Sequence, residues 1–207
     1  MPPIHHMLYR CPRCGHDPLL RLVRRAECPD CGTVFERGKG SDILIRTPGS
    51  PTRVSTAREL LVAASAMVDD SLDECMEGDA PIHQARVAVG RAEGQDIVRF
   101  NGHVLGFSER IKSEGKGILR LYSDRVIWCA NGNDPVAWPL EVIRAIQISS
   151  RAIQVRFLPC GLRQFEFLED SPKRWEDLFR LALQRFYAAR GEIIVEFQPQ
   201  IVTESLP

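Results

Sequence analysis

The 207-residue sequence has no long hydrophobic run and no net charge. Its longest strongly apolar run, residues 60–68, is nine residues long, whereas a helix that crosses a bilayer needs ~20. The N-terminal residues lack the charged start and apolar stretch of a signal peptide. We therefore predict no transmembrane segment and a cytoplasmic location, with a peripheral position on the cytoplasmic face of a membrane as the alternative.

Neither sign of charge is in excess, since 27 basic residues balance 27 acidic ones. A dedicated nucleic-acid binder usually carries a clear basic excess, so this balance argues against that class. The apolar fraction of 44% and the charged fraction of 26% are typical of a folded globular chain and exclude a wholly disordered, collagenous or coiled-coil one. The length predicts one or two domains.

Familiar catalytic motifs are absent as well. The sequence contains no G-x-S-x-G, no G-x-x-x-x-G-K-[ST] and no G-x-G-x-x-G, which are the motifs of common nucleophile and phosphate sites. His83 and His103 have no acidic partner at a recognisable spacing. We expect the protein not to be an enzyme. The scattered Cys75, Cys129 and Cys160 are interpreted as small buried hydrophobic residues.

The strongest pattern present is a doubled cysteine pair. Cys11 and Cys14 precede Gly15, and Cys28 and Cys31 precede Gly32, with thirteen residues between the pairs. Two thiolates three residues apart on a tight turn can grip one metal ion, and a second such turn completes a tetrahedron. The spacing predicts a structural Zn²⁺ site with four sulfur ligands and no open position for substrate. Iron is the alternative, because it also accepts four sulfurs.

These Cys-Pro-x-Cys-Gly knuckles resemble a zinc ribbon over residues 8–37. The resemblance implies a small module, residues 1–40, with strands near 19–23 and 33–36 as partners. Zinc ribbons as a family bind nucleic acid, bind partner proteins or bind nothing. Because Tyr9 and Phe35 are the only aromatic residues of this segment, a platform for single-stranded nucleic acid is the weaker hypothesis.

Residues 41–83 are predicted to link two modules. The Gly, Ser and Pro content of 38–54 is typical of a linker, and Thr56 with Glu59 forms a capping-box pattern that starts a helix. An acidic run follows, which we interpret as a solvated face rather than a cation site; it comprises Asp69, Asp70, Asp73, Glu74, Glu77 and Asp79.

From residue 84 the hydrophobic period changes to two, which predicts short antiparallel strands in a sandwich or small barrel. The expected strands are 84–89, 96–100, 103–111, 117–122, 125–130, 135–138, 142–148, 152–158 and 162–168. A long amphipathic helix then starts at Ser171-Pro172, presents an apolar stripe that begins at Trp175, and ends at Gly191. Residues 192–197 are a candidate last strand.

Two segments in this region, Gly117–Trp128 and Trp138–Ile143, resemble strand pairs of the pleckstrin-homology (PH) superfold, closest to its GRAM-like or bacterial PH-like form. The resemblance covers about residues 103–190. It implies that residues 84–200 form an antiparallel PH-like β-sandwich or barrel capped by a C-terminal helix. The whole chain is then a small zinc ribbon followed by an α+β domain.

In eukaryotic relatives of that fold a basic pocket binds inositol phosphate headgroups, and bacterial members often act as protein-interaction modules. A charge-protected, solvated sheet edge is the other interpretation of the basic residues here. The equivalent basic residues are Arg110, Lys112, Lys116, Arg120 and Arg125.

The working hypothesis is a non-catalytic zinc-binding adaptor or accessory subunit. It would dock on a partner protein or on a membrane-bound complex from the cytoplasmic side. The alternatives are a peripheral sensor of anionic lipid headgroups and a zinc-ribbon regulator that binds nucleic acid.

Overall fold

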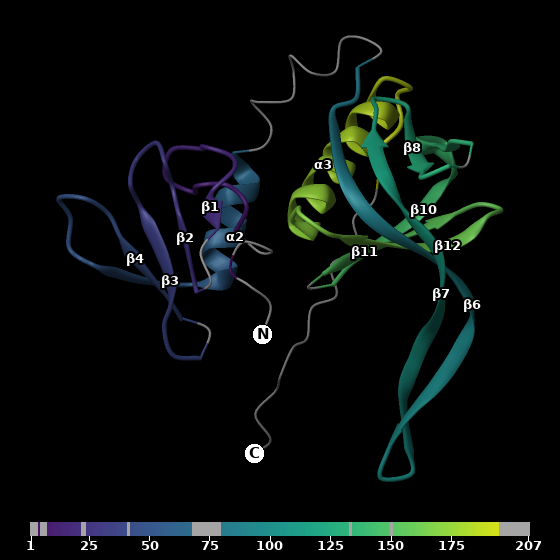
Figure 1. Cartoon of the computed structure of the whole chain (residues 1–207), viewed down its shortest axis with the longest axis horizontal. Helices are drawn as coiled ribbons and strands as arrows, with labels where there is room; N and C mark the ends of the chain where they lie inside the picture. The colour runs from purple at the N-terminus through teal and green to yellow at the C-terminus, as the bar shows by residue number, and fades with distance from the viewer. Residues whose placement is uncertain are drawn as a thin grey trace.

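The computed structural model describes residues 4, 8–21, 24–40, 42–67, 80–132, 134–149 and 151–194. They form two antiparallel sheets, each with its own apolar core (Figure 1). The N-terminal unit consists of β1 (Leu20–Arg21), β2 (Arg25–Glu27), β3 (Val34–Arg37), β4 (Asp42–Arg46), β5 (Arg53–Thr56) and α2 (Ala57–Ala66). The β domain consists of β6 (His83–Phe100), β7 (His103–Leu121), β8 (Arg125–Ala130), β9 (Val136–Pro139), the short 3₁₀ helix η2 (Leu140–Val142), β10 (Ile143–Ile148), β11 (Ala152–Phe157), β12 (Gly161–Phe167) and α3 (Pro172–Ala188).

The N-terminal sheet is larger than the sequence predicts. Its strand order is β1-β2-β3-β4-β5, so β2 lies between the two strands expected to be partners. The prediction of a linker over 38–54 is wrong, because β4 and β5 continue the sheet. Ile43 of β4 is buried with Phe35 of β3 in the core of this unit, and this burial outweighs the turn-rich composition around it.

Helix α2 begins at the predicted capping box. The Glu59 amide donates to Thr56 Oγ1 at 3.2 Å, and the Thr56 amide donates to Glu59 Oε2 at 3.0 Å. Leu60 and Ala64, four residues apart on one face, are buried against the N-terminal core. The acidic run from Asp69 to Asp79 lies outside the described residues.

The β domain has seven strands in the order β10-β11-β12-β6-β7-β8-β9. The nine-strand prediction is wrong because the gaps expected at 90–95 and 112–116 lie inside β6 and β7, where β-bulges shift the register but pairing continues. The turn between the two strands is at Asn101-Gly102. Both residues have positive φ, 48° and 81°, as a tight two-residue hairpin turn requires.

β6 and β7 are much longer than the other strands of their sheet. β12 pairs with β6 only up to Arg91, and β8 pairs with β7 only from Gly117 onward. Residues 92–112 therefore form a two-stranded hairpin that extends away from the domain (Figure 1). We call this segment the hairpin arm.

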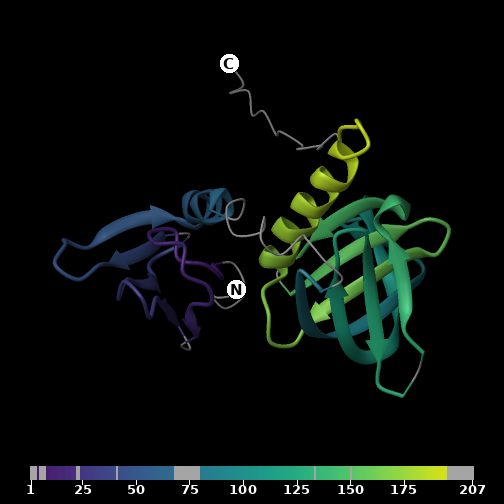
Figure 2. The same ribbon diagram turned by 90° about the horizontal axis from the view of Figure 1, so that it is seen from above.

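Helix α3 completes the core of the β domain. It begins after Ser171, whose side chain accepts from the Arg174 amide, and carries Pro172 in its first turn, as predicted. Trp175 and Phe179 are fully buried in the core. Gly191, with φ of 73°, follows the helix end. Figure 2 shows α3 along the side of the curved sheet that faces the N-terminal unit.

The seven-stranded sheet is open. Its edge strands β9 and β10 do not pair with each other in the described structure, so the sheet does not close into a barrel. Residues 192–194 are not part of a strand, and the rest of the candidate strand 192–197 lies outside the described residues. Within the described part of the chain, no helix has both the length and the apolar character needed to cross a bilayer.

Candidate metal centre and the network beside it

The four paired cysteines lie on two turns of the same design. The Gly15 amide donates to the Cys11 carbonyl at 2.9 Å, and the Gly32 amide donates to the Cys28 carbonyl at 3.0 Å. The two glycines have φ values of 77° and 65°. Each turn needs this left-handed backbone after its second cysteine, and glycine adopts it without steric cost. The repeated sequence thus produces a repeated geometry.

These turns bring the four sulfur atoms of Cys11, Cys14, Cys28 and Cys31 within 4.8 Å of one another. The Cys11–Cys31 and Cys14–Cys28 sulfur distances are 3.7 and 3.4 Å. A tetrahedral zinc ion with ordinary bond lengths separates its sulfurs by about 3.8 Å. The donor set and its spacing therefore fit a four-sulfur metal ion, with Cys11 and Cys28 buried and Cys14 exposed.

The thiols differ in acidity in the absence of metal. Burial is the main cause of a raised pKa at Cys11, and it is also the main cause of a raised pKa at Cys14. Burial also acts on Cys31, but hydrogen bonding from the side chain and amide of Thr33 outweighs it and lowers the pKa of Cys31 to about 6. Since the metal binds thiolates, loading the site releases the proton of every ligand cysteine that is still a thiol.

The two other cysteines that the structure describes, Cys129 and Cys160, do not join this cluster. Cys129 is half-buried, with its sulfur 3.6 Å from Arg120 Nη1. Cys160 is exposed, so its interpretation as a buried hydrophobic residue is wrong. Its position in the tight connection between β11 and β12 leaves it outside the core. Cys75 lies outside the described residues.

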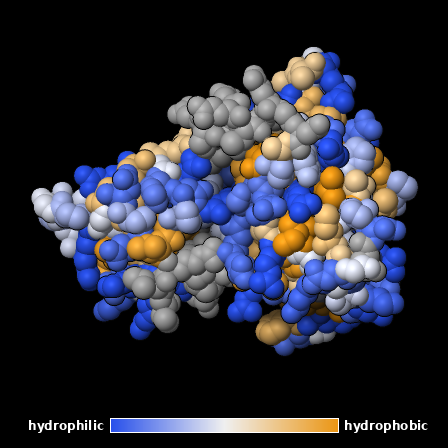
Figure 3. Space-filling view, turned by 45° about the horizontal axis from the view of Figure 1, so that its top comes forward, coloured by the Kyte–Doolittle hydropathy of each residue, from blue (hydrophilic) through white to orange (hydrophobic). Residues whose placement is uncertain are grey.

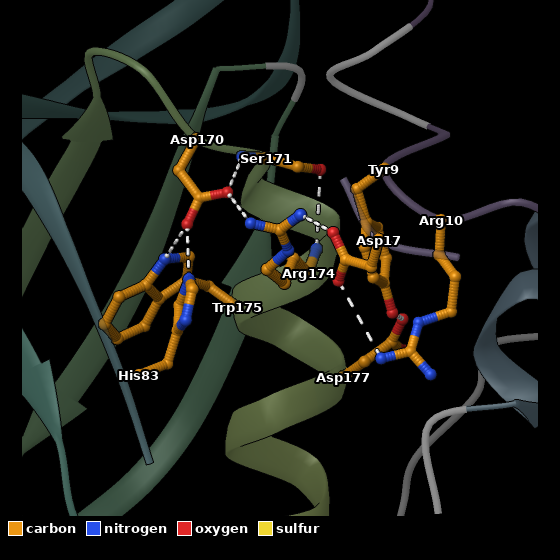
Figure 4. A network of polar contacts seen from close by, with 9 residues as sticks. All are labelled: Tyr9, Arg10, Asp17, His83, Asp170, Ser171, Arg174, Trp175 and Asp177. Atoms are coloured by element: carbon orange, nitrogen blue, oxygen red, sulfur yellow. Dashed lines mark hydrogen bonds and ion pairs between the residues drawn. The ribbon is translucent and has the colours of Figure 1, made fainter. Parts of the chain in front are cut away.

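A second polar constellation joins the N-terminal unit to α3 (Figure 4). Asp177 of α3 is fully buried. It accepts hydrogen bonds from the Tyr9 hydroxyl at 2.8 Å and from the Ser65 hydroxyl at 3.0 Å. Lys173 Nζ, one helical turn earlier, lies 2.9 Å from the same carboxylate. The ring of Tyr9 is buried among the core residues of the β domain, so this contact combines packing with hydrogen bonds.

Arg174 extends the same network to β6. Its guanidinium pairs with Asp17 of the N-terminal unit and, at 2.8 Å, with Asp170. Asp170 also accepts from Trp175 Nε1 at 2.8 Å and lies 2.7 Å from His83 Nε2. A continuous chain of contacts therefore runs from the N-terminal unit through the start of α3 to the first residue of β6. We call the Tyr9–Asp177 and Asp17–Arg174–Asp170–His83 contacts the inter-unit network.

Burial and pairing shift several pKa values in this network. Burial raises the pKa of Tyr9, and the Asp177 carboxylate raises it further. Burial raises the pKa of Asp17 more than its pairing with Arg174 lowers it. For Asp170 burial is outweighed by the hydrogen bond with His83 and by the Arg174 charge, so its pKa is lowered. For Lys173 the hydrogen bonds to Asp177 and Glu176 outweigh burial and raise its pKa.

The five basic residues considered as possible headgroup or partner contacts are spread from the hairpin arm to the sheet. Lys112 lies on the hairpin arm with Glu93 at 3.1 Å, and Arg110 lies on the arm with Asp96 at 2.9 Å. The other three are near the sheet: exposed Lys116 on β7, Arg120 beside Gln84 at 3.3 Å, and Arg125 of β8 beside Asp124 at 2.8 Å. The visible face in Figure 3 is mostly hydrophilic, with hydrophobic residues in separate small patches.

Sequence reasoning missed the inter-unit network. His83 and Asp170 are 87 positions apart, and Tyr9 and Asp177 are 168 apart, so no local spacing connects them. Helical spacing places Asp177 on the face of α3 opposite the Trp175 stripe, so its burial against the N-terminal unit has no local signal either. A charged residue at a buried position demands partners.

Comparisons with known proteins do not assign a family. No family model matches the chain, and no curated protein is significantly similar to it.

Proposed function

We propose that this protein is a non-catalytic zinc-binding adaptor in which a zinc ribbon and a PH-like domain act as one body. The observation that carries the proposal is the inter-unit network, which fixes the cysteine-bearing unit on α3 through a buried carboxylate and a buried tyrosine. A free linker would let the two units move independently. A joint of this kind instead presents two binding surfaces at a fixed separation, which suits an adaptor.

Zinc is the proposed metal because the four sulfurs have the spacing of a tetrahedral site. Four protein ligands leave no coordination position for water or substrate, so the ion would stabilise the fold rather than act on a substrate. The strand order of the β domain and the helix across its sheet support the PH-like assignment.

We propose a protein partner, alone or in a membrane-bound complex on the cytoplasmic side. The headgroup-sensor alternative has less support, because Arg110, Lys112 and Arg125 each have an acidic neighbour. The nucleic-acid alternative would need a basic surface, and the balanced charge of the chain does not favour one.

Two measurements test this proposal. Elemental analysis of the purified protein should find one zinc ion per chain. Purification of the tagged full chain from its native host, with membranes retained, should recover a partner in fixed stoichiometry. The same partner should be recovered by a variant with Gln at all five basic positions, 110, 112, 116, 120 and 125. Loss of that partner on neutralisation would contradict the adaptor and favour binding through charge.

A further inference from the structure

The hairpin arm carries the densest group of exposed apolar side chains in the described structure. Phe100 is 63% exposed, Leu105 66% and Phe107 67%. Elsewhere the exposed apolar residues are separated along the chain, which is ordinary for a protein surface. The group near the arm tip consists of Ile97, Val98, Phe100, Val104, Leu105 and Phe107.

These side chains lie on both faces of the arm. Ile97 and Phe107 are directly opposite each other in the ladder and so share one face. The next pair, Val98 and Gly106, faces the other way. The register shifts after Val98, so Leu105 of β7 has no partner residue on β6. A bulge of this kind changes the direction in which a side chain points. A flat protein surface could cover only one face of the arm. The apolar side chains on both faces are therefore buried together only in a medium that surrounds the tip.

The charge of the tip is one-sided. Residues 97–108 contain Arg99 and no Asp or Glu. The nearest acidic residues are already engaged, since Asp96 pairs with Arg110 at 2.9 Å and Glu109 accepts from Gln95 at 2.8 Å. An apolar tip with one cation and no acid is complementary to an anionic, apolar medium.

We propose that the tip of the hairpin arm inserts into the interfacial layer of an anionic lipid bilayer. This inference goes beyond the proposed adaptor function and does not depend on it. It also differs from the headgroup hypothesis, because the contact is made by apolar side chains at the tip rather than by a basic pocket in the sheet.

The backbone of the arm limits the depth of insertion. No described strand pairs with the outer edges of residues 92–100 or 103–112. Their outward N–H and C=O groups cannot enter hydrocarbon without losing hydrogen bonds. Interfacial elements reach about 5–10 Å into a membrane, which at ~3.3 Å per residue takes in about three residues of each strand. The turn Asn101-Gly102 would enter first, followed by Phe100 and by residues 103–105, with Arg99 at the level of the phosphates.

The test is co-sedimentation of the full chain with vesicles of equimolar phosphatidylcholine and phosphatidylglycerol. The double variant Phe100→Asp/Leu105→Asp should reduce partitioning by about tenfold or more. The matched control is Val136→Asp/Leu158→Asp, which places the same charges at exposed apolar positions of the same domain. It should bind like the wild type, as should the variant with Gln at the five basic positions.

A second readout measures depth. Trp128, Trp138 and Trp175 are all buried, so a Trp introduced by Phe100→Trp would be the exposed one. Brominated phosphatidylcholine should quench its fluorescence more strongly than that of Phe107→Trp. Equal sedimentation of the arm variant and its control would overturn the inference. So would failure of the wild type to bind these vesicles, which would leave a protein cleft as the occupant of the tip.

Discussion

The buried contact between Tyr9 and Asp177 offers a direct measure of how firmly the two units are joined. Tyr9→Phe removes only the hydroxyl that donates to Asp177 at 2.8 Å. The ring, which is 4% exposed and packs in the core of the β domain, stays in place. The substitution therefore isolates one hydrogen bond of the inter-unit network.

The structure sets the size of the expected effect. A hydrogen bond to a charged group contributes ~1.5–3 kcal/mol. Asp177 keeps Ser65 and Lys173 after the substitution, so its charge is not left without partners. We expect Tyr9→Phe to lower the free energy of unfolding by about 1.5–2 kcal/mol, which is the lower part of that range.

Urea unfolding followed by Trp fluorescence and far-UV circular dichroism measures this change. The control is Tyr122→Phe, because Tyr122 stacks with Arg125 outside the network and should lose little. In a double-mutant cycle, Tyr9→Phe and Asp177→Asn should be coupled by about 1 kcal/mol or more, since they remove the same contact. Equal stability of Tyr9→Phe and the wild type, with no coupling, would refute a rigid joint.

The remaining predictions concern the metal, the acid range and the core. Cys28→Ser should release zinc and unfold the N-terminal unit, because metal binding supplies much of the stability of so small a site. Far-UV circular dichroism should still show a cooperative unfolding transition of the β domain. Loss of both units in a single transition would contradict the division of the protein into two separate cores. Asp170 has a lowered pKa in the folded state, so its stabilising effect is present above the unfolded value of ~3.9 and is lost as the pH falls through the folded value. The difference in unfolding free energy between wild type and Asp170→Asn should therefore shrink below about pH 4, and a pH-independent difference would exclude this role. Trp175→Ala should cost about 3–5 kcal/mol in urea unfolding, since Trp175 is fully buried and donates to Asp170; a loss under ~1 kcal/mol would contradict its place in the core.

Local signals in the sequence were sufficient for the cluster of four cysteines and for the starts of the two helices. The two cysteine pairs and their glycines lie within a few residues of each other, so spacing alone predicts the turns. The same holds for the capping box of α2 and for the start of α3 at Ser171-Pro172. In each case the residues that determine the structure are neighbours along the chain.

The sequence-based predictions were wrong where residues far apart in the sequence determine the local structure. Glu93-Gly94 has turn-like composition, but pairing with β7 on the other side of the hairpin keeps the strand continuous through a bulge. Likewise, residues 42–46 form β4 because they pair with the free edge of β3 and because Ile43 is buried in the core of the N-terminal unit. The placement of Asp177 beside Tyr9 depends on how two units pack, which neither segment encodes alone.

The continuity of β6 from the arm into the sheet has a mechanical consequence. A force applied to the arm tip along its length pulls β6 and β7 in the same direction, so the ladders that join them to β12 and β8 are loaded in shear and their hydrogen bonds resist together. β6 is also the central strand between β12 and β7, and its first residue, His83, contacts Asp170. Tension at the tip is therefore passed through the middle of the sheet and, by way of Arg174 and Asp17, to the unit that holds the four cysteines.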